Sequence, residues 1–250
     1  MTHLADYVVR QFISGQVFFL GMALCLLGGV SRAISTTPRF HTLARLAVLI
    51  GVVLVVLSAA PFPIWEYALF FALLALAAFR PTKRPWHNKA VVAALLVLLW
   101  ALGLMMIRTE VLYSMQPRIA LPAGNTLYVV GDSISIGADP PGKNWPDLLG
   151  DLTSLKVRNL AFGGAKVASA LDNALRINPD DALVILEIGG NDLLGGTSIP
   201  SFRQDLEKML AAVCRPQRRV VMIELPLPPF YNRYGMVQRA LAKSYRFHNS

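Results

Sequence analysis

Four apolar runs in the first half of the chain constrain its fold more than any other feature. The runs cover residues 12–30, 46–60, 64–79 and 90–107. Each approaches the length of about 20 apolar residues that a helix needs to cross a bilayer. Apart from Glu66, charged residues are confined to the connections between the runs. A helix of a soluble bundle would carry a polar face, so four such runs in succession predict four transmembrane helices within residues 1–112.

Basic residues in the connections predict how these helices are oriented. Residues 31–45 carry three arginines and residues 80–89 carry four lysines and arginines, whereas residues 61–63 carry none. Connections rich in Lys and Arg remain in the cytoplasm, so both basic connections are expected there. With four spans, both chain ends and the second half of the protein then lie on the outer side of the inner or plasma membrane. Glu66 lies at the outer edge of its run, where water can solvate it.

The distribution of charge argues against nucleic-acid binding. The chain has a formal net charge of +9, and the part before Ala123 holds 10 basic residues against 3 acidic ones. This positive charge lies beside apolar runs rather than on one face of a folded domain. The two cysteines, Cys25 and Cys214, fall in different halves, so no disulfide framework is expected. No Gly-x-Gly-x-x-Gly or Walker pattern occurs, and the sequence implies neither a nucleotide cofactor nor a metal.

The hydrophobic period changes after a polar connection at residues 113–124. Short β-branched segments then alternate with helical ones. We expect strands at residues 126–130, 157–161, 182–188 and 220–225. We expect helices at residues 145–155, 163–175, 201–214 and 231–245. This alternation predicts a three-layer α/β domain with a parallel sheet over residues 125–250.

Three of the expected strands end in residues that are suited to chemistry. The carboxyl ends of parallel strands share one edge of the sheet, where open α/β sheets bind their ligands. The first strand ends in Gly131-Asp132-Ser133, which makes Ser133 a candidate nucleophile. The others end near Asn159 to Gly164 and in Gly189-Gly190-Asn191-Asp192. Taken singly, each stretch also fits an ordinary turn or a helix N-cap.

Together, these stretches resemble the first three sequence blocks of the SGNH hydrolases, also called the GDSL esterase/lipase family. Gly131-Asp132-Ser133-Ile134 is similar to the nucleophile block, with Ile134 where the family usually has leucine. Residues 159–165 resemble the glycine block, and residues 189–192 resemble the Gly-x-Asn-Asp block. The resemblance covers about residues 126–245 and implies a flavodoxin-like three-layer fold.

The resemblance also implies roles for individual residues. Ser133 would attack an ester carbonyl. The backbone N–H groups of Ser133 and Gly164 and the side-chain amide of Asn191 would form the oxyanion hole, which stabilises the charge of the tetrahedral intermediate. We expect Asp132 and Asp192 to have structural roles. The implied substrate is a small-molecule, lipid or carbohydrate ester, and no cofactor is implied.

The chain departs from the family in its fourth block, Asp-x-x-His, which supplies the general base. Of the four histidines, His3, His41 and His87 belong to the apolar half. His248 follows the last expected helix and should lie at the opposite edge of the sheet from Ser133. We therefore expect the hydrolase domain to lack its last strand and its Asp/His loop in this sequence. The 250-residue chain should then be a poor catalyst.

These observations favour a membrane-anchored SGNH-type serine hydrolase that acts on carboxylic esters through Ser133, with the ester substrate and the lipid bilayer as partners. Two alternatives stay open at this point. One is an envelope acyltransferase or deacetylase that uses the same serine. The other is a non-catalytic membrane binding protein, which the absent Asp-x-x-His would explain.

Overall fold

The computed structural model describes most of the chain. The described residues are 15–35, 37–58, 60–78, 89–115, 126–137, 143–153, 155–178, 183–225, 227 and 230–245. The chain divides into two compact units. We call residues 1–116 with 226–232 the helical unit, and residues 117–225 with 233–250 the α/β unit.

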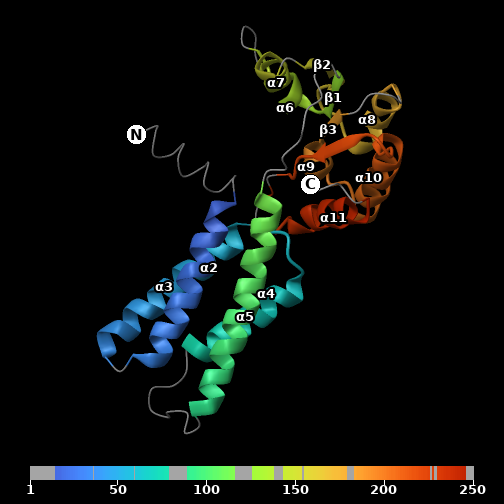
Figure 1. The fold of residues 1–250 in the computed structure, drawn as a ribbon. Helices are drawn as coiled ribbons and strands as arrows, with labels where there is room; N and C mark the ends of the chain where they lie inside the picture. The colour runs from blue at the N-terminus through green and yellow to red at the C-terminus, as the bar shows by residue number, and fades with distance from the viewer. Residues whose placement is uncertain are drawn as a thin grey trace. The chain divides into compact units, whose positions relative to one another are not determined.

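Four apolar helices make up the described part of the helical unit (Figure 1). They are α2 (Gln16–Ile34), α3 (Pro38–Leu57), α4 (Ile64–Ala78) and α5 (Lys89–Ser114). By length and composition α2, α3 and α5 could each cross a membrane, whereas α4 is apolar but shorter, with 15 residues. Among the described residues there are thus three helices that are long and apolar enough to span a membrane, where the sequence predicted four.

The helix ends differ from the ends of the apolar runs. α3 begins at Pro38, eight residues before the run starts, and includes Arg39 and Arg45. α5 continues to Ser114 and includes Arg108 and Glu110. Hydropathy marks where a helix is apolar, but a helix continues into polar surroundings as long as its backbone hydrogen bonds are made. Long arginine side chains can extend along the helix toward water.

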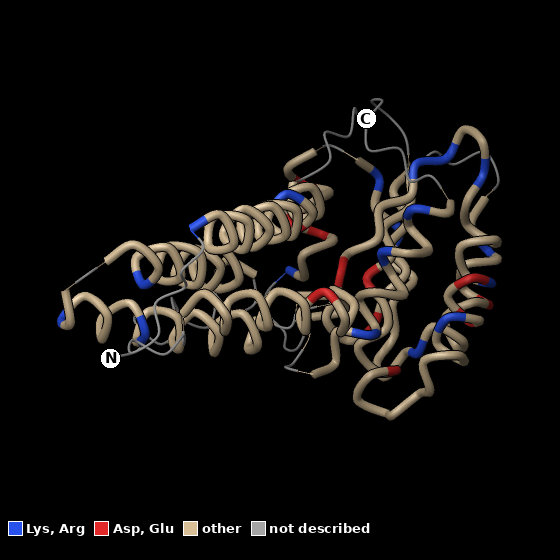
Figure 2. The backbone as a smooth tube through the Cα atoms, turned by 90° about the horizontal axis from the view of Figure 1, so that it is seen from below, with Lys and Arg blue, Asp and Glu red and all other residues tan. Residues whose placement is uncertain are grey.

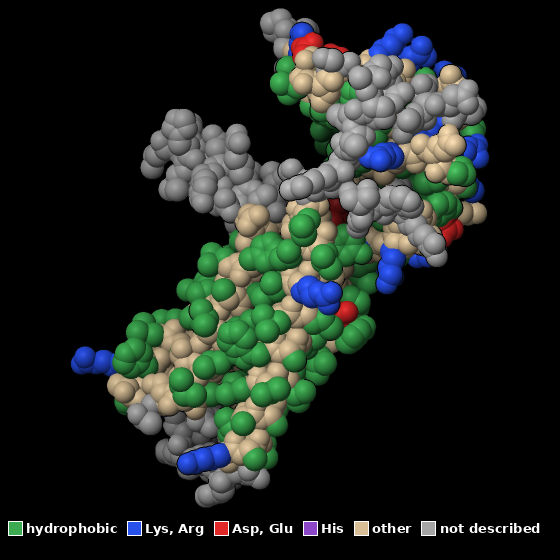
Figure 3. All heavy atoms as spheres, viewed as in Figure 1, with side chains coloured by type: hydrophobic (Ala, Val, Ile, Leu, Met, Phe, Trp, Pro, Cys, Tyr) green, Lys and Arg blue, Asp and Glu red, His purple; other side chains and the backbone are tan. Residues whose placement is uncertain are grey.

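The outward faces of these helices are apolar. Large side chains on α3 are more than half exposed at Leu43, Leu49, Ile50 and Val53. Hydrophobic side chains cover much of the helical unit in the space-filling view (Figure 3). Charged residues are sparse along α2–α5 and frequent in the α/β unit (Figure 2).

Small residues allow α2 and α3 to pack closely. A Cβ atom on Gly51 of α3 would lie 2.7 Å from the carbonyl oxygen of Gly21 and 2.9 Å from the backbone nitrogen of Cys25. A Cβ atom on Gly28 would lie 3.0 Å from the carbonyl oxygen of Ala44. Backbone atoms cannot move aside as side chains do, so glycine sets the distance between the two helices.

Replacing Gly51 with leucine is therefore expected to destabilise the helical unit by about 1–3 kcal/mol, because α2 and α3 must separate. The matched control is Val53→Leu, which places a leucine on the exposed face of the same helix. Thermal unfolding of the purified protein in detergent measures the effect. Equal midpoints for the two variants would contradict this packing.

The α/β unit contains the parallel sheet that the sequence predicted. Its strands are β1 (Thr126–Gly131), β2 (Lys156–Asn159), β3 (Leu183–Glu187) and β4 (Arg219–Met222). Their order is β2-β1-β3-β4, and every pair is parallel. The helices are α6 (Ser133–Ile136), α7 (Trp145–Thr153), α8 (Val167–Ala174), α9 (Gly190–Leu194), α10 (Ile199–Val213) and α11 (Asn232–Ser244).

The helix α10 follows the predicted amphipathic pattern. Leu206, Met209, Leu210 and Val213, which were expected to share one face, are all 0% exposed. Phe202 extends the same face and is also fully buried. At about 25 cal/mol per Å² of apolar surface, burial of five such side chains is a main source of stability for this layer.

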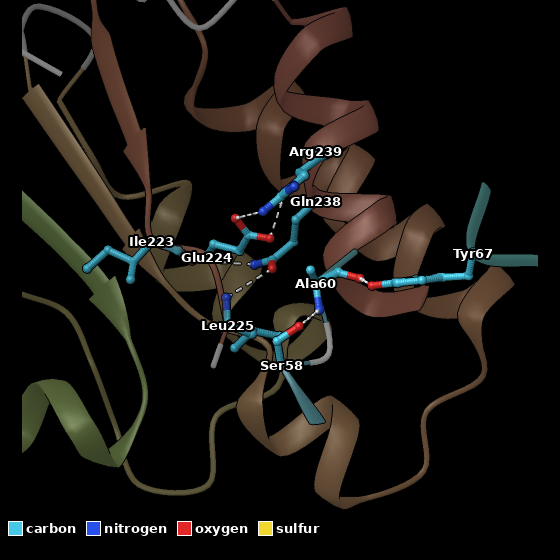
Figure 4. Close-up of polar contacts among 8 residues, drawn as sticks. All are labelled: Ser58, Ala60, Tyr67, Ile223, Glu224, Leu225, Gln238 and Arg239. Carbon is cyan, nitrogen blue, oxygen red and sulfur yellow. Dashed lines mark hydrogen bonds and ion pairs between the residues drawn. The ribbon is translucent and has the colours of Figure 1, made fainter. Parts of the chain in front are cut away.

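β4 ends three residues earlier than expected because side chains replace the strand ladder. The Ile223 N–H still donates to the Leu186 carbonyl at 2.8 Å. The Leu225 N–H then donates to Gln238 Oε1 of α11 at 3.1 Å. The Arg239 guanidinium donates to both carboxylate oxygens of Glu224, at 2.9 and 3.1 Å, and so also fixes α11 to the end of β4 (Figure 4).

In the helical unit, a separate contact closes the turn before α4. The Tyr67 hydroxyl donates to the Ala60 carbonyl there (Figure 4).

Candidate active site

The loop after β1 presents Ser133 to solvent. Ser133 is exposed and opens the one-turn helix α6, whereas Asp132 is 3% exposed. Asp132 Oδ1 accepts a hydrogen bond from the Ile134 N–H at 3.0 Å, which makes Asp132 the N-cap of this turn. The Gly137 N–H closes the turn on the Ser133 carbonyl at 3.2 Å. The nucleophile candidate therefore lies on a short, well-bonded turn at the carboxyl edge of the sheet.

The loop after β2 runs beside the end of β1. The Leu160 N–H donates to the Val129 carbonyl at 2.8 Å, and the Phe162 N–H donates to the Gly131 carbonyl at 3.4 Å. Gly163 and Gly164 follow, both exposed. Gly164 has a φ of 71°, a backbone conformation that favours glycine, and a Cβ atom there would meet nothing within 4 Å. The backbone of Gly164 is thus open on the side where a Cβ would point.

The loop after β3 joins the other two through Asn191. The Asn191 side-chain nitrogen donates to Asp132 Oδ2 at 3.2 Å and to the Ala165 carbonyl at 3.1 Å. One acceptor adjoins Ser133 in the chain, and the other adjoins Gly164. The three stretches that the sequence placed at one sheet edge are therefore connected by hydrogen bonds that centre on Asp132 and Asn191.

Asp192 binds the start of the neighbouring helix α8. Its carboxylate accepts the Val167 N–H at 2.8 Å and a side-chain hydrogen bond from Thr197. Val167 is the first residue of α8, so Asp192 satisfies a free N–H group at the start of that helix from another element. Burial raises the pKa of Asp192 despite these hydrogen bonds. Asp132 and Asp192 thus each accept a backbone N–H at the start of a helix, Asp132 from Ile134 of α6 and Asp192 from Val167 of α8.

Sequence reasoning missed a second polar pair beneath this loop, Ser135 and Glu187. Ser135 Oγ donates to Glu187 Oε2 at 2.8 Å, and the two residues are 0% and 7% exposed. Burial raises the pKa of Glu187, and the nearby Asp132 charge adds to this effect. A glutamate within an otherwise apolar strand, Leu-Val-Ile-Leu-Glu, was the signal that could have revealed it.

The α/β unit, which carries Ser133, has no histidine among its described residues. His41 belongs to α3, where its Nε2 lies 2.7 Å from the Ser35 carbonyl oxygen. His3, His87 and His248 lie outside the described residues. Over the described part of the chain, no three His, Cys, Asp or Glu side chains lie close enough together to hold a metal ion.

Gly164→Ala is expected to lower the acylation rate, because alanine would strain the loop that would carry an oxyanion donor. A left-handed conformation costs a non-glycine residue about 1–2 kcal/mol, and relief of that strain would move the Gly164 N–H. Gly163→Ala is the matched control, because a Cβ atom there also meets nothing and its φ is not positive. Pre-steady-state ester cleavage compares the two variants. Similar rates would show that the conformation at position 164 has no bearing on catalysis.

The second half of the chain is similar in sequence to a known protein family. Residues 129–248 match the family model described as GDSL-like Lipase/Acylhydrolase. The chain is 32% identical over 124 residues to an arylesterase of Vibrio mimicus, which is 46% of this chain and 61% of that protein. It is 34% identical over 118 residues to Esterase TesA of Pseudomonas aeruginosa, which is 44% of this chain and 58% of that protein.

A crystal structure of TesA matches at 30% identity and a TM-score of 0.43, covering 48% of this chain and 74% of that one. The chain spans about three fifths of the length of the two curated relatives. The family model lies within the second half of the chain and includes Ser133, Gly164 and Asn191. Residues 129–248 therefore form a domain of the GDSL-like lipase/acylhydrolase family.

Proposed function

We propose that this protein is a membrane-anchored hydrolase that cleaves carboxylic esters through Ser133. The observation that carries the proposal is the hydrogen-bonded junction of three loops around an exposed serine, in a domain of this family. The names of the arylesterase and esterase relatives favour hydrolysis over the two alternatives.

The proposed reaction begins with attack of Ser133 Oγ on the ester carbonyl carbon, while the serine proton passes to a general base. The C–O bond to the alcohol then breaks, and the alcohol leaves with a proton. The resulting acyl-serine ester is cleaved by water, which releases the carboxylic acid and restores Ser133. No histidine that could serve as this base occurs among the described residues of the α/β unit, and the Asp-x-x-His block of the family does not occur in these 250 residues.

Charge on the carbonyl oxygen would be stabilised by the N–H groups of Ser133 and Gly164 and by the Asn191 amide. The Asn191 nitrogen has two N–H groups, and both have protein acceptors at present. We expect the N–H that donates to the neutral Ala165 carbonyl to exchange this acceptor for the oxyanion when the intermediate forms. Hydrogen bonds to a charged oxygen are about twice as strong as neutral ones, which favours that exchange.

We propose further that α2–α5 cross the membrane four times. α2, α3 and α5 are long enough, and the exposed face of α3 is apolar, as lipid contact requires. With 15 residues α4 rises about 22 Å, so it would cross with help from its flanking residues or from local thinning of the bilayer. Four crossings place both chain ends and the hydrolase domain on the outer side, with residues 31–45 and 80–89 in the cytoplasm.

Cysteine accessibility tests this arrangement. In a chain with Cys25 and Cys214 replaced by serine, a single cysteine is introduced at Thr82 or at the exposed Ser198 of the hydrolase domain. A reagent that does not cross membranes should label position 198 in intact cells and position 82 only after lysis. Labelling of both positions, or of position 82 alone, in intact cells would contradict the four-span topology.

The activity is tested with esters of increasing acyl length, using protein expressed from the complete gene. We expect release of free acid as the main product. A second series adds an alcohol or sugar acceptor. Dominant formation of the acylated acceptor would favour the acyltransferase alternative, and binding without cleavage or a covalent adduct would favour the binding protein.

A further inference from the structure

Ser135 fixes the inner face of the turn that carries Ser133. It lies two residues after Ser133 and is fully buried. Its hydroxyl donates to Glu187 Oε2 at 2.8 Å, and its carbonyl accepts from Asn159 Nδ2 at 2.7 Å. Its N–H donates to the Asp132 carbonyl at 3.1 Å. Partners on β2 and β3 thus hold α6 against the sheet, and the bond to Asp132 closes the turn itself.

Glu187 binds this turn at two points. It is the last residue of β3 and lies opposite Gly131 in the parallel register. Besides accepting the Ser135 hydroxyl, its carboxylate lies near the backbone N–H of Asp132, which lowers the pKa of Glu187 against the effect of burial. One buried side chain therefore contacts the residue before Ser133 and the residue two positions after it.

Gly131 makes this contact possible. A Cβ atom on Gly131 would lie 2.5 Å from Ser135 Oγ and 2.9 Å from Ser135 Cβ, so a larger residue would displace Ser135 from the strand end. With glycine there, Ser135 folds back over the strand and reaches Glu187. The glycine before Asp132-Ser133 thus serves the buried hydrogen bond as well as the turn.

We propose that Glu187 is a positioning residue for catalysis, which holds the backbone on both sides of Ser133 so that its Oγ and its N–H are aligned for attack. Glu187 itself is buried and acts through Asp132 and Ser135 rather than on the substrate. Misplacement of a reacting group by 1 Å can lower a rate by about 10²-fold, so a loose turn would be costly. The inference rests on the proposed role of Ser133 and adds a residue that the serine, glycine and asparagine blocks do not include.

A buried carboxyl group is energetically unfavourable at a position that only has to fill space. Taking a carboxylate out of water is unfavourable unless donors compensate, and an apolar residue would pack there without that requirement. The Ser135 hydroxyl that donates to Glu187 and the Asp132 N–H near its carboxylate both belong to the nucleophile turn. The side chain is therefore placed where its hydrogen bonds control that turn.

The test compares Glu187→Ala, Glu187→Gln and Ser135→Ala for cleavage of a p-nitrophenyl ester by protein expressed from the complete gene. Glu187→Ala and Ser135→Ala should lower kcat by about 10- to 100-fold with KM changed less than about threefold. Glu187→Gln should recover most of kcat, because its amide oxygen can accept the Ser135 hydroxyl. A purely structural role would not produce this split between kcat and KM or this rescue.

The control variant is Glu224→Ala, which removes the ion pair with Arg239 elsewhere in the α/β unit. It should lower thermal stability while leaving kcat near that of the wild type. If Glu187→Ala does not fold, Ser135→Ala decides the question, because it removes one hydroxyl from the same contact. Wild-type kcat in Ser135→Ala or Glu187→Ala would overturn the inference, as would loss of activity in proportion to folded protein. If Ser133→Ala keeps full activity, the proposed function itself fails, and the two failures are thereby distinguished.

Discussion

Replacing Ser133 with alanine is expected to reduce ester cleavage by a factor on the order of 10⁴–10⁶ in protein expressed from the complete gene. The reason is that, in the proposed mechanism, Oγ forms the bond to the acyl group. Ser135, the nearest serine in the chain, is fully buried and donates to Glu187. The measurement is kcat/KM for a short-chain aryl ester, with folding checked by thermal unfolding.

Ser244→Ala provides the matched control for this loss. Ser244 is an exposed serine at the last position of α11, where its hydroxyl donates to the Leu241 carbonyl at 2.9 Å. The control should retain activity within about twofold, as surface substitutions usually have small effects. Appreciable turnover by a folded Ser133→Ala protein would show that another group performs the attack.

Asn191→Ala should have the second-largest effect, a fall in kcat of about 10²–10³-fold with little change in KM. The variant loses a proposed oxyanion donor and also the hydrogen bonds to Asp132 and Ala165. Asn191→Asp should be at least as impaired, because its negative charge would lie beside the Asp132 carboxylate and the developing oxyanion. The measurement is the single-turnover rate of ester cleavage.

Asn173→Ala measures how much of the Asn191→Ala effect comes from a less stable loop rather than from the lost oxyanion donor. Asn173 also donates its side-chain amide to the loop after β2, at 3.0 Å from the Leu160 carbonyl oxygen. Its removal should loosen that loop without removing an oxyanion donor, so kcat should fall far less than in Asn191→Ala. An equal fall in the two variants would assign the Asn191 effect to loop stability alone.

Much of the α/β unit could be predicted because its local and long-range signals agree. Alternating strands and helices gave the parallel sheet, and the spacing of Leu206, Met209, Leu210 and Val213 gave the buried face of α10. Strand ends were harder to predict. β4 ends where Gln238, thirteen residues later, provides the acceptor for Leu225, and no pattern near β4 shows that contact.

The candidate site was predictable in its outline but not in its connections. The sequence placed Ser133, Gly164 and Asn191 at one edge because parallel strands share their carboxyl ends. It did not show that Asp132 binds Asn191 or that Ser135 binds Glu187. These pairs are separated by 59 and 52 positions in the chain, and their contact depends on register and side-chain direction rather than on local propensity.

The helical unit shows a different limit. Apolar runs located α2–α5 but misplaced their ends, because a helix continues through charged residues as long as its backbone hydrogen bonds are made. The same runs gave no information on helix contacts. The close approach of Gly21 and Gly51 follows from a crossing of α2 and α3 that hydropathy does not encode.

The central claim is that Ser133 is the nucleophile, and covalent labelling tests it most directly. Protein expressed from the complete gene is incubated with a fluorophosphonate, which forms a P–O bond to an active serine and releases fluoride. Proteolysis and mass spectrometry then locate the adduct. The account predicts one adduct, on Ser133, that is absent from a folded Ser133→Ala variant. An adduct on another residue, or none on folded protein that cleaves esters, would contradict it.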